Sequence, residues 1–175
     1  MSKLNIVLVG PMGVGKTTIG RQLSRELQLP FFDSDRVIEE RTGADIPWIF
    51  DMEGEDGFRK RESGVLTELL EQDGLVIATG GGIVTRSENR NLLNQGGVVV
   101  YLTASVDQLC KRTSKDKKRP LLQVEDPRQK IEELLAERDP LYKDVADVIV
   151  DTERKGVRGV IKEIVDCYKQ ASSRI

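Results

Sequence analysis

Short, almost continuous apolar runs alternate along the chain with longer segments in which apolar residues recur every three or four positions. The short runs are typical of strands covered on both faces of a parallel sheet, and the wider spacing is typical of amphipathic helices. The last stripe, from Val157 to Tyr168, predicts a helix that packs on the core. Strands are expected at Leu4–Val9, Pro30–Asp33, Leu75–Thr79, Val98–Leu102 and Asp147–Asp151.

This alternation predicts an α/β fold in three layers, with a five-stranded parallel sheet between helices on both faces. The crossovers between parallel strands should be right-handed, and ligands should bind where the carboxyl ends of the strands meet. The chain has 175 residues. We expect one domain over residues 1–175, which is large enough to bury about 70% of its unfolded surface.

Residues 35–74, between the second and third expected strands, form a segment longer than one crossover needs. We expect this insertion to be a helical subdomain that covers an edge of the sheet. The candidate breaks within it are Gly43, Pro47, Gly54 and Gly57.

Residues 10–17 read Gly-Pro-Met-Gly-Val-Gly-Lys-Thr, which matches the phosphate-binding pattern G-x-x-x-x-G-K-[ST] in full. They lie between the first expected strand and a helical pattern with apolar residues four apart from Ile19 to Leu27. The glycines allow successive N–H groups to turn inward, Lys16 supplies charge for the outer phosphates, and the Thr17 hydroxyl can serve magnesium. The sequence therefore predicts a nucleoside-triphosphate site at this junction.

A charged run, Thr113–Val124, breaks the alternation a second time. By composition alone it is a solvated loop that ends in a proline-stiffened turn. In a phosphate-binding protein, however, a basic flap can close over a triphosphate and exclude water. We therefore expect a mobile lid at residues 113–124 that carries Arg119.

Acidic and glycine residues follow two of the expected strands. Asp33 closes the second strand, so its carboxylate should emerge near Thr17, where it can hold magnesium directly or through water. The third strand ends in Gly80, Gly81 and Gly82, where generic nucleotide-binding proteins have an aspartate. This turn is either featureless and flexible or, at the end of a strand, lets backbone N–H groups approach a ligand closely.

Asp35 follows Asp33 by two residues. If the strand continues, both carboxylates share one face; if a helix begins there, Asp35 is its N-cap. Arg59 and Arg138 would each, taken alone, form a surface ion pair. Together they suggest an acceptor with a carboxylate and hydroxyl groups, since arginine binds carboxylates through two parallel hydrogen bonds.

The composition narrows the class of protein. A net charge of −2 argues against a nucleic-acid or membrane partner. No segment is long and apolar enough to span a membrane, and a strand so near the first residue leaves no room for a signal peptide, so a cytoplasmic protein is expected. Cys110 and Cys167 lack metal-ligand spacing and are expected to be reduced thiols. With no histidine present, zinc chemistry and histidine-based acid–base catalysis are not expected.

An ordered set of short motifs resembles the shikimate kinase family over essentially the whole chain. The resemblance implies a nucleoside-monophosphate-kinase-like P-loop fold with five parallel strands. It also implies transfer of the γ-phosphate of ATP to the 3-hydroxyl of shikimate, which gives shikimate 3-phosphate and ADP on the route to chorismate and the aromatic amino acids. The motifs are Gly10–Thr17, Asp33-Ser34-Asp35, Phe58-Arg59, Gly80-Gly81-Gly82, Arg119-Pro120-Leu121-Leu122 and Arg138-Asp139-Pro140-Leu141-Tyr142.

By the same resemblance, residues 34–62 form the substrate-binding subdomain and residues 113–124 the lid. Lys16, Asp35 and Arg119 would be catalytic, and Asp35 would hold the reacting hydroxyl. Shikimate would contact Asp35, Arg59, Gly80, Gly81, Gly82 and Arg138, and magnesium would contact Thr17 and Asp33. ATP would contact Gly13, Val14, Gly15, Lys16, Thr17, Thr18, Arg112, Arg119 and Lys155, of which Arg112 and Arg154–Lys155 would pack on adenine. The protein is expected to act as a monomer.

Two other functions stay open at this point. One is a different small-molecule kinase on the same fold, such as a gluconate or nucleotide kinase. The other is a nucleotide-dependent regulatory protein without catalytic activity. Such a switch would not need Asp35, Arg59 and Arg138, which favours a kinase with a small acidic acceptor.

Overall fold

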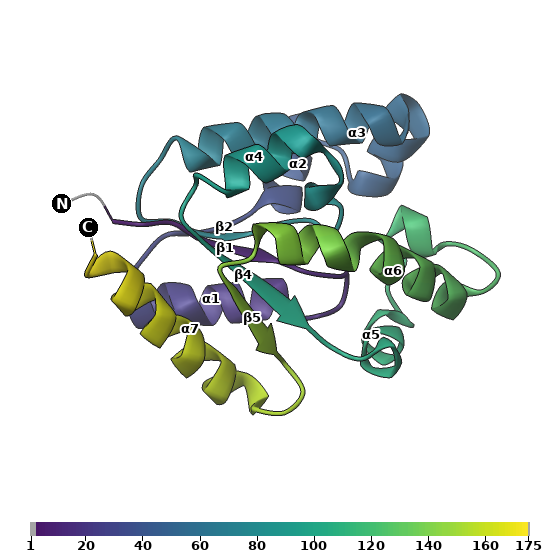
Figure 1. Ribbon diagram of the computed structural model, residues 1–175. Helices are drawn as coiled ribbons and strands as arrows, with labels where there is room; N and C mark the ends of the chain where they lie inside the picture. Colours follow the sequence, from purple (N-terminus) through teal and green to yellow (C-terminus); the bar gives the residue numbers. More distant parts are fainter. Residues whose placement is uncertain (1–2, 175) are drawn as a thin grey trace.

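Five parallel strands form one sheet in the order β2-β3-β1-β4-β5 (Figure 1). The protein is described by a computed structural model, which covers residues 3–174; residues 1, 2 and 175 of the predicted domain lie outside the described residues. The strands are β1 Ile6–Val9, β2 Phe31–Asp33, β3 Val76–Ala78, β4 Val98–Thr103 and β5 Val148–Asp151.

The five predicted strands are confirmed, with ends that differ by one or two residues. The largest difference is at β1, which begins at Ile6 and not at Leu4. The Asn5 side chain makes hydrogen bonds there: its Oδ1 accepts from the N–H of Leu75, and its Nδ2 donates to the carbonyl of Gln72. The side chain of Asn5 thus ties the segment before β3 to the start of β1.

Helices cover both faces of the sheet, as Figure 1 shows. Because side chains alternate along a strand, Ile6 and Leu8 of β1 join one core cluster with residues of α1 and α7, and Val7 and Val9 join the other with residues of α3 and α4. The α/β prediction with helices on both faces is therefore confirmed. In the described residues the α-helices are α1 Lys16–Leu27, α2 Ser34–Thr42, α3 Ile46–Leu70, α4 Ser87–Leu93, α5 Val106–Thr113, α6 Pro127–Val145 and α7 Gly156–Ser172.

The insertion after β2 consists of α2 and α3, and only two of its four candidate breaks interrupt a helix. Gly43 ends α2 in the left-handed conformation, with φ 69°. Gly54 kinks α3, with φ 71° and ψ 176°. Pro47, in contrast, lies in the first turn of α3, where a missing N–H costs nothing. Gly57 continues the helix.

Thr113, the first residue of the predicted lid segment, is the last residue of α5. A turn at residues 114–115 and irregular backbone up to residue 119 come next, and a short 3₁₀ helix, η2, follows at Pro120–Leu122. Leu122 is buried against Leu109 and Ile131 of α5 and α6 in one core cluster, which anchors the end of the segment. The mobility of this segment stays a prediction.

Candidate active site

The phosphate loop connects β1 to α1 at the centre of the sheet, where the strand order reverses. Gly10, Gly13 and Gly15 all have positive φ, at 147°, 83° and 104°. A Cβ on Gly10 would lie 2.5 Å from the carbonyl oxygen of Leu102 in β4, so the loop leaves no space for a side chain there. The predicted reason for these glycines, unusual backbone angles at a strand-to-helix turn, is confirmed.

Lys16 begins α1 and is buried, with 9% of its surface exposed. Its Nζ donates to the carbonyls of Gly10 (2.6 Å) and Pro11 (2.9 Å), two residues of its own loop. Burial, followed by the nearby charge of Arg119, lowers the pKa of Lys16 to about 7. An anion in front of the loop would stabilise the charged form, since opposite charges favour ionisation.

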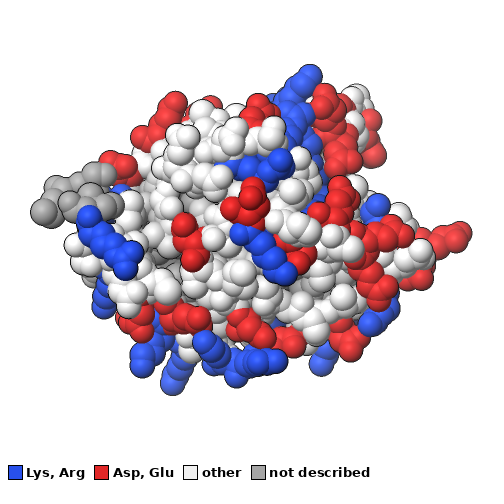
Figure 2. Space-filling model, in the orientation of Figure 1, with Lys and Arg blue, Asp and Glu red and all other residues white. Residues whose placement is uncertain are grey.

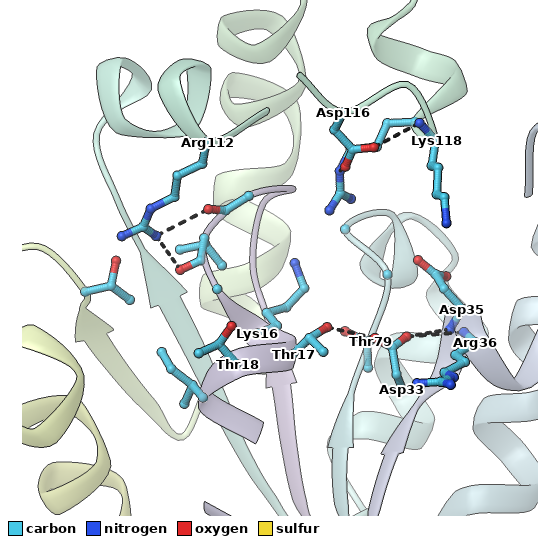
Figure 3. A pocket seen from close by; sticks show the side chains of 18 of the residues that line it. Lys16, Thr17, Thr18, Asp33, Asp35, Arg36, Thr79, Arg112, Asp116 and Lys118 are labelled. Carbon is cyan, nitrogen blue, oxygen red and sulfur yellow. Dashed lines mark hydrogen bonds and ion pairs between the residues drawn. The ribbon is translucent and has the colours of Figure 1, made fainter. Parts of the chain in front are cut away.

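Thr17 and Asp33 meet as the sequence predicted. The hydroxyl of Thr17 donates to Oδ2 of Asp33 over 2.8 Å, so the start of α1 and the end of β2 place two oxygen ligands side by side (Figure 3). Within residues 3–174, no group of three or more histidine, cysteine, aspartate or glutamate side chains could hold a metal ion. One carboxylate and one hydroxyl suit Mg²⁺, which keeps several waters and takes further oxygens from substrate phosphates.

The N-cap of α2 is Asp33 and not Asp35. Oδ1 of Asp33 accepts from the backbone N–H groups of Asp35 and Arg36, so Asp33 uses one oxygen for the cap and the other for Thr17. Asp35 therefore lies in the first turn of the helix. Its carboxylate does not cap α2, so the alternative in which Asp35 is the N-cap is wrong. Oδ1 of Asp35 is buried and, among the described residues, has no hydrogen-bond partner.

The surroundings of Asp35 change its acidity. Burial, followed by the carboxylate of Glu62, raises the pKa of Asp35 to about 7. Both carboxylates approach Gly80: a Cβ on this glycine would lie 2.7 Å from Oε2 of Glu62 and 2.8 Å from Oδ1 of Asp35. Gly80 therefore allows two acidic groups to share the end of β3.

Arg59 projects from α3 toward the same turn. Its Nη1 donates to Oε1 of the fully buried Glu62 at 2.9 Å, and its Nη2 donates to Glu55 at 3.2 Å. Burial raises the pKa of Glu62, and the charge and hydrogen bond of Arg59 only partly offset this. A Cβ on Gly82 would lie 2.3 Å from the guanidinium nitrogens, so a side chain at this position would displace the guanidinium of Arg59.

Arg138 reaches the glycine turn from α6. It is 4% exposed, and its Nε is buried without a hydrogen-bond partner among the described residues. A Cβ on Gly81 would lie 3.5 Å from its Nη1, and the hydroxyl of Tyr142, one turn further along α6, donates to the carbonyl of Gly81. The two predicted arginines thus converge on Gly80–Gly82 from separate helices. A buried guanidinium with an unused donor is suited to bind a carboxylate.

A cavity of about 870 Å³ extends from the phosphate loop past Thr17, Asp33 and Asp35 to the lid segment (Figure 3). A smaller cavity of about 70 Å³ adjoins it and is lined by Arg59, Glu62 and Arg138. The two cavities therefore meet at the end of β3 and the lid segment. The residues that line both cavities are Asp35, Ile46, Gly80, Gly81, Lys118 and Arg119.

Of the three residues predicted to pack on adenine, Arg112, Arg154 and Lys155, only Arg112 lines the larger cavity. Nη1 of Arg112 donates to the carbonyls of Gly13 and Val14, which fixes this side chain against the phosphate loop. Lys155 does not line the cavity, and its ammonium pairs with Glu163 of α7. Thr152 and Val157 line the cavity instead, one on each side of Lys155 in the sequence.

Several functional candidates were missed by sequence reasoning. Glu62 lies three residues after Arg59, and Asp116 lies three residues before Arg119. A spacing of three places two side chains within reach of each other on a helix, so this spacing could have indicated both acidic partners. Met12, a variable position of the phosphate loop pattern, lines the smaller cavity and carries no signal of its own.

The face shown in Figure 2 carries basic and acidic side chains interspersed with uncharged residues. In residues 3–174 no helix is long and apolar enough to cross a membrane. Cys110 and Cys167 are free and half-buried. Independence from nucleic acids and membranes stays a prediction.

Comparison with known proteins identifies the family. The family model described as shikimate kinase matches residues 12–169. A shikimate kinase of Pseudomonas savastanoi pv. phaseolicola is 59% identical over 161 residues, covering 92% of this chain and 94% of the relative. A shikimate kinase of Vibrio cholerae is 55% identical over 168 residues, covering 96% and 97%. The chain belongs to the shikimate kinase family.

Solved structures agree with this assignment. The shikimate kinase of Acinetobacter baumannii, solved in complex with shikimate, superposes with a TM-score of 0.93 at 51% identity and covers 96% of this chain, which covers 94% of it. A gluconokinase of Sinorhizobium meliloti, with a TM-score of 0.61 and 16% identity, shares only the fold. The protein is therefore a phosphotransferase of the shikimate pathway that uses ATP, and the gluconate kinase and regulatory alternatives are set aside.

Proposed function

We propose that the two adjoining cavities are the sites where the γ-phosphate of ATP passes to the 3-hydroxyl of shikimate, giving shikimate 3-phosphate and ADP for chorismate and aromatic amino acid synthesis. The observation that carries this assignment of sites is the position of Asp35, whose side chain lines both cavities. A group that accepts or orients a proton during transfer must face both the acceptor and the phosphate. The relative solved with shikimate supports the choice of acceptor.

ATP binds along the larger cavity, with its phosphates over the loop at residues 13–18. The backbone N–H groups and the Nζ of Lys16 receive the phosphate oxygens, while Arg119 approaches from the lid segment. Phosphoryl transfer proceeds through a loose transition state, so catalysis depends on positioning and on positive charge near the transferred group. Lys16 and Arg119 supply that charge, and Arg112 flanks the nucleoside.

Thr17 and Asp33 hold magnesium in this proposal. When bound with ATP, the ion would neutralise charge that develops on the phosphate oxygens. Asp33 keeps one oxygen on the backbone cap of α2 in this arrangement, which fixes the orientation of the other. The choice between a direct contact and one through water depends on the room that the phosphates leave.

Shikimate binds in the smaller cavity. Arg59 and Arg138 hold its carboxylate, and the Gly80–Gly82 turn lets the ring approach the end of β3 closely. Asp35 first orients the 3-hydroxyl by a hydrogen bond and accepts its proton late in the transfer. A pKa of about 7 brings Asp35 nearer to the operating pH than a free aspartate, which improves it as a proton acceptor.

We also propose that the protein works as a monomer in the cytoplasm. ATP is available there, and the two free cysteines are compatible with a reducing compartment. A mass measurement in solution at the concentration of the assay tests the monomer.

A coupled ADP-release assay with shikimate, gluconate and nucleoside monophosphates tests the reaction. We expect ADP release that depends on shikimate and magnesium, with the product phosphorylated at the 3-hydroxyl by nuclear magnetic resonance. Turnover of gluconate or a nucleotide in preference to shikimate would contradict the proposed acceptor. Phosphorylation at another hydroxyl would contradict the position given to Asp35.

A further inference from the structure

One aspartate organises the turn that carries Arg119. Oδ2 of Asp116 accepts from Nε of Arg119 at 2.7 Å, and Oδ1 accepts from the backbone N–H of Lys118 at 2.9 Å. The backbone N–H of Asp116 in turn donates to the carbonyl of Thr113, the last residue of α5. Asp116 therefore links the end of α5 through its backbone N–H, and the turn and the guanidinium through its carboxylate.

The pair lies in the candidate active site. Asp116, Lys118 and Arg119 all line the larger cavity, and Figure 3 shows Asp116 and Lys118 across the cavity from the phosphate loop. About one third of each side chain in the pair is exposed, 33% for Arg119 and 31% for Asp116. The charge of Arg119 is close enough to Lys16 to contribute to the low pKa of that lysine.

The contact occupies only one of the three guanidinium nitrogens. Within residues 3–174, no hydrogen bond or ion pair given by the structure uses Nη1 or Nη2 of Arg119. These two nitrogens form the planar fork that binds phosphate oxygens in pairs. Asp116 thus holds the guanidinium from behind and leaves its phosphate-binding edge free.

We propose that Asp116 is a positioning residue for phosphoryl transfer, which holds Arg119 by its Nε so that the Nη1–Nη2 edge faces the transferred phosphate. This inference rests on the proposed function, in which Arg119 is the catalytic arginine of the lid. An arginine side chain has many rotamers, and fixing them before the transition state removes an ordering cost from the reaction. In this proposal Asp116 acts through Arg119 and not directly on a substrate.

Asp116→Asn separates the two contacts of the carboxylate. An amide has one acceptor oxygen, so the variant can keep the hydrogen bond to Lys118 and the turn, but cannot also accept from Arg119. We expect kcat to fall about tenfold or more, as for a misplaced catalytic group. The dissociation constant of ATP, measured by titration calorimetry, should not rise, because the change removes a negative charge from the larger cavity.

The Arg119→Ala background shows whether Asp116 acts through the arginine. If it does, adding Asp116→Asn to Arg119→Ala should change kcat less than twofold, because no guanidinium remains to be positioned. The matched control is Asp107→Asn on α5, which removes an aspartate–arginine pair of the same 2.7 Å length whose Asp107 side chain is 80% exposed. We expect this control to keep kcat within about twofold of the unchanged protein.

Three outcomes would overturn the inference. Asp116→Asn could be as active as the unchanged protein while Asp116→Ala is impaired, which would assign the turn and not the guanidinium contact to Asp116. The loss could persist in full in the Arg119→Ala background, or ATP binding could weaken in parallel with kcat. Failure of the proposed function is distinct, because the unchanged protein would then show no ADP release with shikimate.

Discussion

The two halves of the active site are built in different ways. In the proposed arrangement the phosphate side comes from eight consecutive residues, Gly10–Thr17, at the junction of β1 and α1, and its binding groups are mostly backbone N–H groups held by local glycine conformations. The acceptor side is assembled from α2, α3, the end of β3 and α6, and its groups are charged side chains buried close together. Function on the phosphate side is therefore local, whereas on the acceptor side it depends on tertiary packing.

Burial of charge is the cost of the second arrangement. Asp35, Arg59, Glu62 and Arg138 crowd around three glycines, and three of the four have a buried polar atom without a partner among the described residues. Unpaired buried groups destabilise a fold unless a ligand satisfies them. The unpaired groups on the acceptor side thus lower the stability of the free protein and are available to bind a carboxylate and hydroxyl groups. Variants on the two sides should therefore behave differently.

The largest effect is expected on the phosphate side. Lys16→Ala should lower kcat by about 10³ or more, since it removes a buried positive charge that faces the transferred group in the proposed arrangement. Stability should be nearly unchanged, because the buried ammonium already has a lowered pKa and its removal ends a desolvation cost. Steady-state kinetics and thermal unfolding in parallel test both statements.

Lys60→Ala is the control for this substitution, since Lys60 pairs with Asp56 on the surface, with 72% of its side chain exposed. Activity of Lys16→Ala within tenfold of the unchanged protein would mean that the loop binds phosphate through its backbone alone. That result would sharpen the comparison by making the phosphate side independent of side chains.

On the acceptor side, Asp35→Asn should lower kcat by about 10² to 10⁴, the usual worth of a positioned base. The amide keeps the shape and can orient a hydroxyl, but it cannot take the proton. ATP affinity should be kept, since Thr17 and Asp33 remain in place. Single-turnover transfer with ATP binding recorded in parallel distinguishes the cases: near-normal transfer would reduce Asp35 to an orienting group, and lost ATP binding would assign it to the phosphate side.

The same division explains what the sequence could predict. Gly10, Gly13 and Gly15 were assigned correctly because their role follows from backbone angles within one turn. Asp33 and Thr17 were also placed together, since strand ends in a parallel sheet meet at one edge. These inferences need only local geometry and the order of elements.

Tertiary placement limited the remaining predictions. The sequence left two alternatives for Asp35, a strand residue or the N-cap of a helix, because it does not show that α2 begins at Ser34 with Asp33 as its N-cap. Glu62 was missed because only the fold shows that α3 buries it beside Arg59. Lys155 turns to Glu163 on α7, a contact between residues eight apart that neither charge pattern nor motif indicates.

A smaller effect is expected for Arg59→Lys. Lysine keeps the charge but loses the planar fork, and it cannot bind both Glu62 and a substrate carboxylate in the geometry of a guanidinium. The KM for shikimate should rise about tenfold, equivalent to one good hydrogen bond, while the KM for ATP changes little. Initial rates with each substrate varied in turn provide the measurement.

Arg61→Lys is a matched control for this variant on the same helix. Arg61 pairs with Glu53, and 44% of its side chain is exposed, so we expect both KM values to stay unchanged. If Arg59→Lys weakened ATP and shikimate equally, the two sides of the site would not be separable in the way proposed here.

The smallest effect concerns stability and its dependence on pH. The pKa of Asp35 is raised from 3.8 to about 7 in the folded protein, so between these values the folded state holds a proton that the unfolded state has released. This group therefore increases the free energy of unfolding at low pH, and that contribution is lost as pH rises through 7.

Asp35→Asn removes the ionisation, so without substrates it should be more stable than the unchanged protein at pH 8, by about 1 to 2 kcal/mol. Urea unfolding at pH 8 and pH 4.5 tests this, and the advantage should shrink at the lower pH, where both proteins carry a neutral side chain at this position. If the difference in the free energy of unfolding stayed constant with pH, the charged form of Asp35 would not be destabilised by burial. The acceptor side would then reduce the stability of the fold no more than the phosphate side does.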